Sequence, residues 1–408
     1  MFENLVHQEI KKSIISDIKN TNLPGAILYA GPEACGKLSA ALETARILSC
    51  HIHPQGKWTC QCPSCLQHKA LSCSNLMLMG PRDCSLEILA AKDTFLYAYK
   101  KNDSFLDATR YLFLRSIRKL TLRFNPIIWQ GEKDFSKIGS LIDLINEDLE
   151  ILDFPRALPA ANKLETICDD LVKQSIKLEN DFLYDSIPVN QIRNMEKWAH
   201  IKSEEGKKTV IIENADRMAS SVRNALLKIL EEPPADCEFI LLTSNRNAIM
   251  QTILSRVRTY TFASRNIEQQ NEVISRVFHK ENLQSNIQDF LLSYLTVSPQ
   301  TIKEEAKNFY NAICNRKIPD LSKVVKNCED FYPRIVLKIF LTNLTELQRP
   351  LLYSQKGTEA SAKCMKLLRE CWDNITLYNQ KPQAAFEILL RDMSHINILN
   401  EGVFQVNE

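Results

Sequence analysis

The feature that most constrains the fold is a glycine-rich turn between an apolar strand and a helix. Residues 31–37 read G-P-E-A-C-G-K, which is the spacing G-x-x-x-x-G-K of a phosphate-binding loop. The apolar residues 26–30 before it predict a buried strand, and a helix is expected after it. In such loops backbone N–H groups surround phosphates and the lysine reaches the terminal ones. The spacing predicts an α/β domain with a nucleotide site at Gly31, Gly36 and Lys37; a glycine turn without a ligand is the alternative.

Two positions that support hydrolysis in such sites are altered. The residue after the lysine should be Ser or Thr, whose hydroxyl binds Mg²⁺, but it is Leu38, which offers no oxygen to a hard cation. The second half of the site should be an apolar strand ending in Asp-Glu. Residues 209–212 form that strand, but Glu213 and Asn214 follow it. Glu213 can still face a metal, whereas Asn214 cannot act as a base. The sequence therefore predicts a degenerate site that can bind ATP or ADP, without hydrolysis.

Most of the remaining chain is predicted to be helical. Gly and Pro number only 10 and 16 among 408 residues, and few helix breakers favour long helices. A helix at 220–231 and a buried parallel strand at 238–243 follow the second strand. Residues 50–84 look irregular, whereas 85–186 and 263–408 have helical periodicity.

Several features predict a cytoplasmic protein. No run approaches 18 apolar residues, so we expect no membrane span, and the N-terminus lacks the apolar segment of a signal peptide. In a reducing compartment the 13 cysteines do not form a disulfide framework.

Four cysteines predict a structural zinc site. Cys50, Cys60, Cys62 and Cys65 fall within sixteen residues, and four thiolates suit tetrahedral Zn²⁺ with no open position. The short gap between Cys60 and Cys62 leaves the fourth ligand open. The candidates to replace one thiolate are His51, His53 and His68, with Cys73 as a spare. Unrelated cysteines in a reduced loop are the alternative.

Charge gives little sign of a dedicated nucleic-acid binder. Lys and Arg number 51 against 49 Asp and Glu, a net charge of +2, and tail-driven binders carry a clear basic excess. One stretch, 110–124, is basic and aromatic and would suit DNA phosphates. An amphipathic helix with a solvated face is the favoured reading, because acidic residues such as those at 147–150 lie nearby.

Five segments resemble the clamp-loader AAA+ subunits of bacterial DNA polymerase III. Residues 224–234, N-A-L-L-K-I-L-E-E-P-P, and 252–257, T-I-L-S-R-V, look like two hallmarks of that family. Residues 187–193 are similar to the family's segment before the second strand, and 382–390 resemble the end of its C-terminal collar. Residues 211–218 are similar to the delta-prime branch rather than to the ATP-hydrolysing gamma/tau subunits.

The resemblance implies a three-part architecture. An α/β AAA+ P-loop domain, with a parallel sheet flanked by helices, would span residues 1–262. It would contain a zinc module at about 50–73 and a helical insertion at about 85–186. A helical lid at 263–317 and an all-α collar for oligomerisation at 318–408 would follow.

The resemblance also implies a role in DNA replication. Delta-prime, delta and gamma/tau subunits form a five-membered ring that opens the sliding clamp and places it on primed DNA. Delta-prime members are commonly stators without ATPase activity, and the arginine of their Ser-Arg element points at ATP in the neighbouring subunit. Carried over to Ser255 and Arg256, this implies an arginine finger acting in trans.

Two other functions remain open. An active, ATP-hydrolysing gamma/tau-like subunit is the main alternative, and Leu38 and Asn214 argue against it. A zinc-dependent nucleic-acid-binding module is the other, and the near-neutral charge argues against that. We expect no independent catalysis, which an ATPase assay would test.

Overall fold

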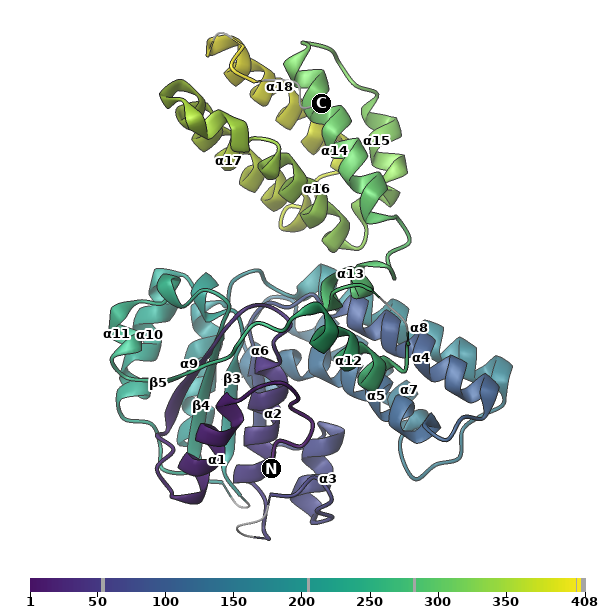
Figure 1. Ribbon diagram of the computed structural model, residues 1–408, viewed down its shortest axis with the longest axis vertical. Coiled ribbons are helices and arrows are strands. Elements are labelled where there is room, and N and C mark those ends of the chain that lie inside the picture. The colour runs from purple at the N-terminus through teal and green to yellow at the C-terminus, as the bar shows by residue number, and fades with distance from the viewer. Residues whose placement is uncertain (53–55, 204–205, 282–283, 401, 405–408) are drawn as a thin grey trace. The chain divides into compact units, whose positions relative to one another are not determined.

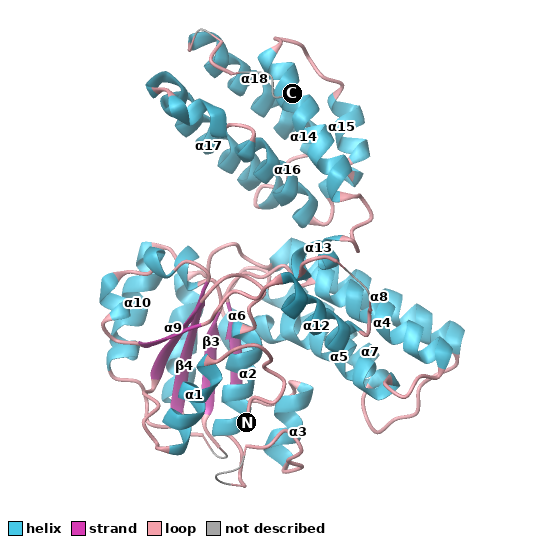
Figure 2. Ribbon diagram, in the orientation of Figure 1, coloured by secondary structure: helices cyan, strands magenta, loops and turns pink. Residues whose placement is uncertain are grey.

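The computed structural model shows a parallel sheet surrounded by helices, followed by further helices (Figures 1 and 2). It describes residues 1–52, 56–203, 206–281, 284–400 and 402–404. The chain divides into two compact units, Met1–Leu291 and Leu292–Glu408, which are treated separately below. Among the described residues, no helix combines the length and apolar character needed to cross a membrane.

The first unit contains the sheet, whose strand order is β2-β3-β4-β1-β5 with every neighbouring pair parallel. The strands are β1 (Ala26–Ala30), β2 (Leu76–Met79), β3 (Lys208–Ile212), β4 (Cys237–Thr243) and β5 (Arg258–Thr261). All five therefore end at one edge, where ligands bind in open parallel sheets. The predicted α/β fold class and its three predicted strands are confirmed. The two edge strands, β2 and β5, are absent from the sequence prediction.

Alternate residues of β1, β2, β3 and β4 pack into two apolar cores, one on each face of the sheet. On one face Ile27 and Tyr29 pack with α1 (Ile10–Lys19) and α2 (Lys37–Leu48). On the other face Ala26 and Leu28 join a larger core. The helices contributing to that core include α9 (Val189–His200), α10 (Ser220–Glu231) and α11 (Gln251–Leu254). Continuous burial of the central strands explains their apolar sequences.

The segment between β2 and α9 forms a group of helices that we call the helical block. It contains α4 (Ser85–Lys101), α5 (Leu106–Thr121), η1 (Leu122–Phe124), α6 (Pro126–Trp129), α7 (Phe135–Leu152) and α8 (Ala161–Phe182). Phe95 of α4 and Phe113 of α5 stack with their ring centroids 5.9 Å apart inside the core shared with the sheet. The helical periodicity of this segment thus corresponds to observed helices. The region 50–84, expected to be irregular, contains β2 and a short helix, α3 (Pro63–Ala70).

The basic residues of α5 point mainly into the first unit. Arg110 is only 4% exposed and donates to the carbonyl oxygens of Leu152 (2.7 Å), Asp153 (2.9 Å) and Arg156 (2.7 Å). These carbonyls lie at and after the end of α7, where backbone acceptors have no partner within the helix. Arg110 therefore ties α5 to α7.

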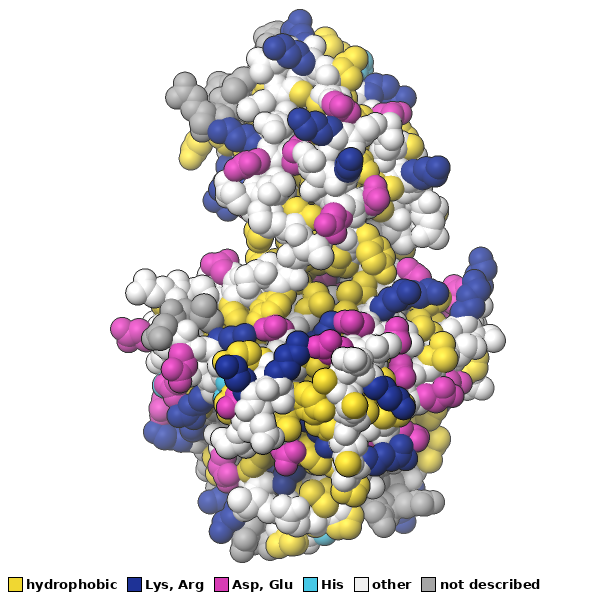
Figure 3. All heavy atoms as spheres, turned by 90° about the vertical axis from the view of Figure 1, so that its right-hand side faces the viewer, with side chains coloured by type: hydrophobic (Ala, Val, Ile, Leu, Met, Phe, Trp, Pro, Cys, Tyr) yellow, Lys and Arg dark blue, Asp and Glu magenta, His cyan; other side chains and the backbone are white. Residues whose placement is uncertain are grey.

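Two further arginines of α5 contact the end of α3. Arg115 donates to the carbonyl oxygens of His68 (3.4 Å) and Lys69, and Arg118 donates to that of Ala70 (3.1 Å). Figure 3, which shows the side of the molecule carrying the helical block, has basic and acidic side chains interspersed there. The arginines of 110–124 thus make contacts inside the first unit. They form neither a phosphate-binding surface nor a solvent-exposed helix face.

The contacts of Arg110 predict a large stability loss on truncation. Arg110→Ala would remove the donor to three carbonyl groups, one in a buried and two in partly buried hydrogen bonds, and we expect the free energy of unfolding to fall by about 3 kcal/mol. Urea unfolding measures this. Arg156→Ala is the matched control, because the Arg156 side chain is 59% exposed and its pair with Glu150 spans 3.7 Å. Equal losses in the two variants would contradict the internal role of Arg110.

The second unit is a helical bundle. Its elements are α14 (Pro299–Cys314), α15 (Leu321–Asn327), η4 (Glu329–Phe331), α16 (Arg334–Glu346), η5 (Arg349–Tyr353), α17 (Gln355–Thr376) and α18 (Pro382–Leu399). Phe309, Phe340 and Phe386 meet edge to face at its centre, with centroids 5.2–5.9 Å apart. Two helices, α12 (Ile267–Phe278) and α13 (Ile287–Leu292), precede this bundle. The division after Leu291 falls inside the segment expected to be the lid, and the lid and collar bounds remain predictions.

Candidate nucleotide site and metal centre

Two glycines shape the loop between β1 and α2, the predicted phosphate-binding loop. Gly36 caps α2 with φ +99°, a conformation that favours glycine. A Cβ atom at Gly31 would lie 2.7 Å from the carbonyl oxygen of Phe262, so only glycine fits there. Lys37 Nζ donates to the carbonyl oxygens of Gly31 (2.6 Å) and Pro32 (2.5 Å). These are contacts that a lysine can exchange for phosphate oxygens.

Leu38 has a packing role that explains its apolar character. Its side chain is 7% exposed and belongs to the core between the sheet and α2. The position that would supply a hydroxyl to Mg²⁺ is therefore part of the hydrophobic core.

Arg265 lies against the same loop, although no motif in the sequence indicates a role for it. Its guanidinium donates to the carbonyl oxygens of Ala34 (2.8 Å) and Val6 (3.0 Å), and a Cβ atom at Gly36 would come within 3.0 Å of it. Arg265 is 8% exposed, and burial lowers its pKa. It joins the N-terminal segment, the phosphate loop and the chain after β5 through one side chain.

Glu213 follows β3 and is 7% exposed, and both of its carboxylate oxygens are paired with arginines. Arg82 Nη1 donates to one oxygen at 2.9 Å, and Arg123 Nη2 pairs with the other. Burial opposes ionisation, but the two guanidinium groups more than offset it and lower the pKa of Glu213. The carboxylate expected to face a metal thus contacts two cationic side chains, one from the β2–α4 loop and one from the helical block.

Asn214 adopts a left-handed conformation after Glu213, with φ +52°. Its Nδ2 donates to the carbonyl oxygen of Pro81 at 2.6 Å. The amide therefore ties together the chain segments that follow β2 and β3, and the position expected to supply a catalytic base has a structural contact instead.

Glu87 extends the charged cluster and predicts a pH dependence. Burial opposes its ionisation, but Lys119 and Arg82 lower its pKa to about 2. Because that folded-state pKa lies below the ordinary value, its ion pairs stabilise the fold above about pH 4.5 and lose this effect as the pH falls towards 2. The stability deficit of Glu87→Gln relative to wild type should therefore shrink between about pH 5 and about pH 3. Urea unfolding at both pH values tests this, with exposed Glu150→Gln as control; an unchanged deficit would contradict it.

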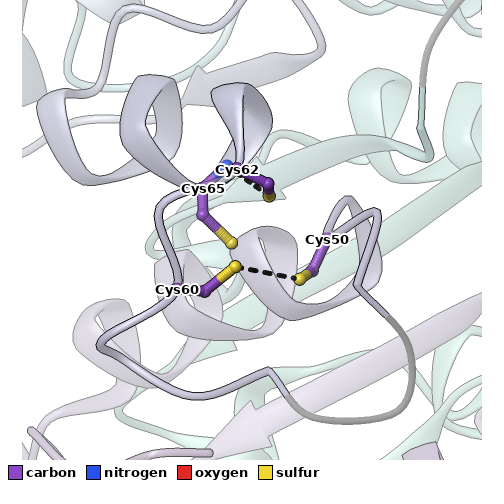
Figure 4. Close-up of side chains that lie close together, drawn as sticks. All are labelled: Cys50, Cys60, Cys62 and Cys65. Atoms are coloured by element: carbon purple, nitrogen blue, oxygen red, sulfur yellow. Dashed lines mark hydrogen bonds between the residues drawn. The ribbon is translucent and has the colours of Figure 1, made fainter.

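The four predicted cysteines meet in one cluster, shown in Figure 4. The Sγ atoms of Cys50, Cys60, Cys62 and Cys65 all lie within 4.8 Å of one another. Those of Cys50 and Cys60 are 3.8 Å apart, and a tetrahedral ion with Zn–S bonds of about 2.3 Å separates sulfurs by about 3.8 Å. The arrangement could hold a metal ion, and Cys60 belongs to it despite its short spacing from Cys62.

The surroundings of the cluster act differently on its thiols, since burial raises the pKa of Cys50 and of Cys65, whereas the pKa of Cys62 is lowered. Burial opposes ionisation of Cys62, but the backbone N–H groups of Cys65 and His51 and the nearby thiols lower its pKa to about 6. Arg46 Nη1 lies 3.1 Å from the Sγ atom of Cys65. His68 and Cys73 are outside the group of potential ligands among the described residues, and His53 lies outside the described residues. A set of four thiols suits a soft or borderline metal such as zinc.

Arg256 lies after α11, far in sequence from the loop at 31–37. Its side chain pairs with the exposed carboxylate of Glu231. Its Nε (3.2 Å) and Nη2 (3.0 Å) both donate to Glu231, and Nη1 donates to the carbonyl oxygen of Thr252 (2.9 Å) and contacts Ser255 Oγ (3.4 Å). The side chains of Arg256 and Glu231 are 28% and 59% exposed. The structure thus brings together the two segments, 224–234 and 252–257, that carry the family resemblance.

Comparison with known proteins gives matches to subunits of DNA polymerase III. A family model described as "DNA polymerase III, delta subunit" matches residues 6–121 and 152–266. The delta' subunit of Bacillus subtilis is 38% identical over 78 residues, 19% of this chain and 24% of that protein. The delta' subunit of Haemophilus influenzae is 32% identical over 130 residues, 30% of this chain and 39% of that protein.

A gamma subunit has a similar level of identity. The DNA polymerase III gamma subunit of Buchnera aphidicola is 37% identical over 76 residues, 19% of this chain and 20% of that protein. The chain thus covers between a fifth and two fifths of the length of these relatives. The family match stops at 121 and resumes at 152, so it includes parts of the helical block.

Proposed function

Because the chain belongs to the DNA polymerase III delta subunit family, we propose that it is a delta-prime-like clamp-loader subunit without ATPase activity of its own. It assembles with gamma/tau and delta subunits in a five-membered ring in the cytoplasm. The ring loads the sliding clamp on primed DNA, and this chain contributes as a stator. Its direct partners are therefore the other ring subunits, and it acts on the clamp and on DNA as part of the assembled ring.

The observation that carries this proposal is the state of three positions of the expected catalytic site, of which two, Leu38 and Asn214, are altered. Leu38 is packed in the core, both oxygens of Glu213 are paired with arginines, and Asn214 bonds to the backbone. A motor subunit needs these positions to bind Mg²⁺ and activate water. Similar identity to delta' and gamma relatives leaves the active gamma/tau-like subunit as the alternative, and these side chains favour the inactive form.

The remaining site residues have roles within this proposal. Gly31, Gly36 and Lys37 retain the capacity to bind ATP or ADP phosphates. The four-cysteine cluster binds one structural Zn²⁺, which joins Cys50 after α2 to Cys65 in α3. Ser255 precedes Arg256, and Arg256 serves the ATP of the neighbouring subunit.

Reconstitution and an ATPase assay test the proposal together. We expect the purified chain to hydrolyse ATP no faster than its Lys37→Ala variant. We also expect it to form a stable complex with gamma/tau and delta subunits on size-exclusion chromatography. Lys37-dependent turnover by the isolated chain would favour the motor subunit. Failure to form the complex would contradict the clamp-loader role itself.

A further inference from the structure

The carboxylate of Glu213, at the end of β3, is paired on both oxygens with arginine side chains of the same chain. Glu213 is at the same sheet edge as the phosphate loop: Gly31 N donates to Thr243 O at 3.2 Å, and Glu213 N donates to Met79 O at 2.9 Å. In a P-loop site this edge holds the cation beside the phosphates. Here the cationic groups on the Glu213 carboxylate are guanidinium groups instead.

Arg123 is held in place by contacts other than its pair with Glu213. Arg123 is 1% exposed in its side chain, and it donates to the carbonyl oxygens of Gly80 (2.8 Å) and Met79 (3.3 Å). Its own carbonyl accepts the indole N–H of Trp129 at 2.8 Å. Loss of a ligand at the nucleotide loop would leave these contacts intact, so the pairing with Glu213 is a permanent feature of the fold.

The ion pairs extend from Glu213 to a second carboxylate, that of Glu87. Arg82 also pairs with Glu87 at 3.1 Å, and Lys119 of α5 pairs with the other oxygen of Glu87. Three cationic side chains, Arg82, Arg123 and Lys119, thus surround two carboxylates. A divalent cation that approached Glu213 would meet two guanidinium groups and no unpaired oxygen on that carboxylate, whereas Mg²⁺ in proteins is usually bound through one or two carboxylates.

We propose that Arg82 and Arg123 replace the divalent cation at Glu213, so that the loop at 31–37 takes a nucleotide diphosphate or triphosphate only as the metal-free anion. Leu38 contributes by removing the hydroxyl ligand, but the arginine pair is the dominant barrier to Mg²⁺. This inference rests on the proposed function in that it concerns the same degenerate site. It is tested on the isolated chain, whereas the clamp-loader role is tested by complex formation, so one can fail without the other.

The test compares nucleotide binding with Mg²⁺ and with EDTA, using a fluorescent N-methylanthraniloyl ADP as the probe. Wild type and Leu38→Thr should bind it equally, within about twofold, in both conditions. Leu38→Thr with Arg82→Ala and Arg123→Gln should bind it about tenfold or more tightly with Mg²⁺, because both carboxylate oxygens and the hydroxyl are then available. Leu38→Thr with Arg118→Gln is the matched control, since Arg118 pairs with Asp153, and it should stay indifferent to Mg²⁺.

The outcomes separate clearly. A tenfold Mg²⁺ preference in wild type or Leu38→Thr would overturn the proposal, as would a folded triple variant that shows none. Circular dichroism and thermal unfolding establish whether the triple variant folds. If it does not, Leu38→Thr with Arg82→Ala replaces it, because the Arg82 side chain is 31% exposed and its removal frees one oxygen of Glu213. That variant should prefer Mg²⁺ by about threefold or more, and indifference would likewise overturn the proposal.

Discussion

Arg256→Ala should lower the single-turnover rate of ATP hydrolysis at the neighbouring subunit by about 10³-fold, while the clamp-loader ring stays assembled. A guanidinium group against the γ-phosphate stabilises charge that develops in the transition state, and arginines in this role contribute about 10³–10⁵ in rate. The Arg256 side chain is 28% exposed, and its contacts within this chain include Glu231, the carbonyl oxygen of Thr252 and the hydroxyl of Ser255. Single-turnover hydrolysis by the reconstituted complex on clamp and primed DNA is the measurement.

Arg258→Ala is the matched control for this experiment. Arg258 is two residues away, is 47% exposed, and pairs with Asp17 of the same chain at 3.2 Å. It should leave hydrolysis unchanged. Equal rates in the Arg256 and wild-type complexes would remove Arg256 from the role, and Arg256→Lys should not restore activity, because an ammonium group lacks the planar fork of guanidinium.

Cys65→Ser should release the metal and destabilise the first unit strongly. We expect about one zinc per chain in wild type and less than about 0.3 in the variant, with the free energy of unfolding lower by about 4 kcal/mol or more. The physical reason is that the ion links the chain just after α2 to α3, and α3 in turn receives hydrogen bonds from Arg115 and Arg118 of the helical block. Metal analysis and urea unfolding on the same preparations measure both effects.

Cys73→Ser separates metal loss from ordinary core damage. Cys73 is 6% exposed but lies outside the four-sulfur cluster, so this variant should keep its zinc even if its stability falls. A wild-type preparation without zinc, or Cys65→Ser with normal zinc content, would contradict the site.

Local sequence was sufficient for the central strands and for the loop that connects β1 to α2. Residues 26–30 and 238–243 are apolar runs between turn signals, and buried parallel strands have this pattern. The helix at 220–231 has the same bounds in the structure, since Pro233 and Pro234 follow its end. The edge strands lack such signals. β5 has only one buried residue among its four, and β2 reads L-M-L-M, which is four residues of good helix formers.

The partners of charged residues were not predictable from sequence. Glu213 stands at the expected position after β3, but its contacts come from Arg82 and Arg123, which are 131 and 90 residues away in the chain. The spacing of basic residues in α5 shows which face of a helix they share, but not that carbonyl groups at the ends of α3 and α7 lie against that face. The cluster of four cysteines, in contrast, could be predicted, because its members are close in sequence and because thiols bind a limited range of ligands.

The strand order has a consequence for the time at which the sheet can form during translation. The neighbours of β1 are β4 and β5, which begin at Cys237 and Arg258, so an apolar strand made near the start of synthesis waits for about 200 further residues before any pairing partner leaves the ribosome. At about 5–20 residues per second that delay is on the order of 10–40 s. Such unpaired strand edges bind chaperones or aggregate, and β1 is therefore exposed to misfolding from its own synthesis until the arrival of β4.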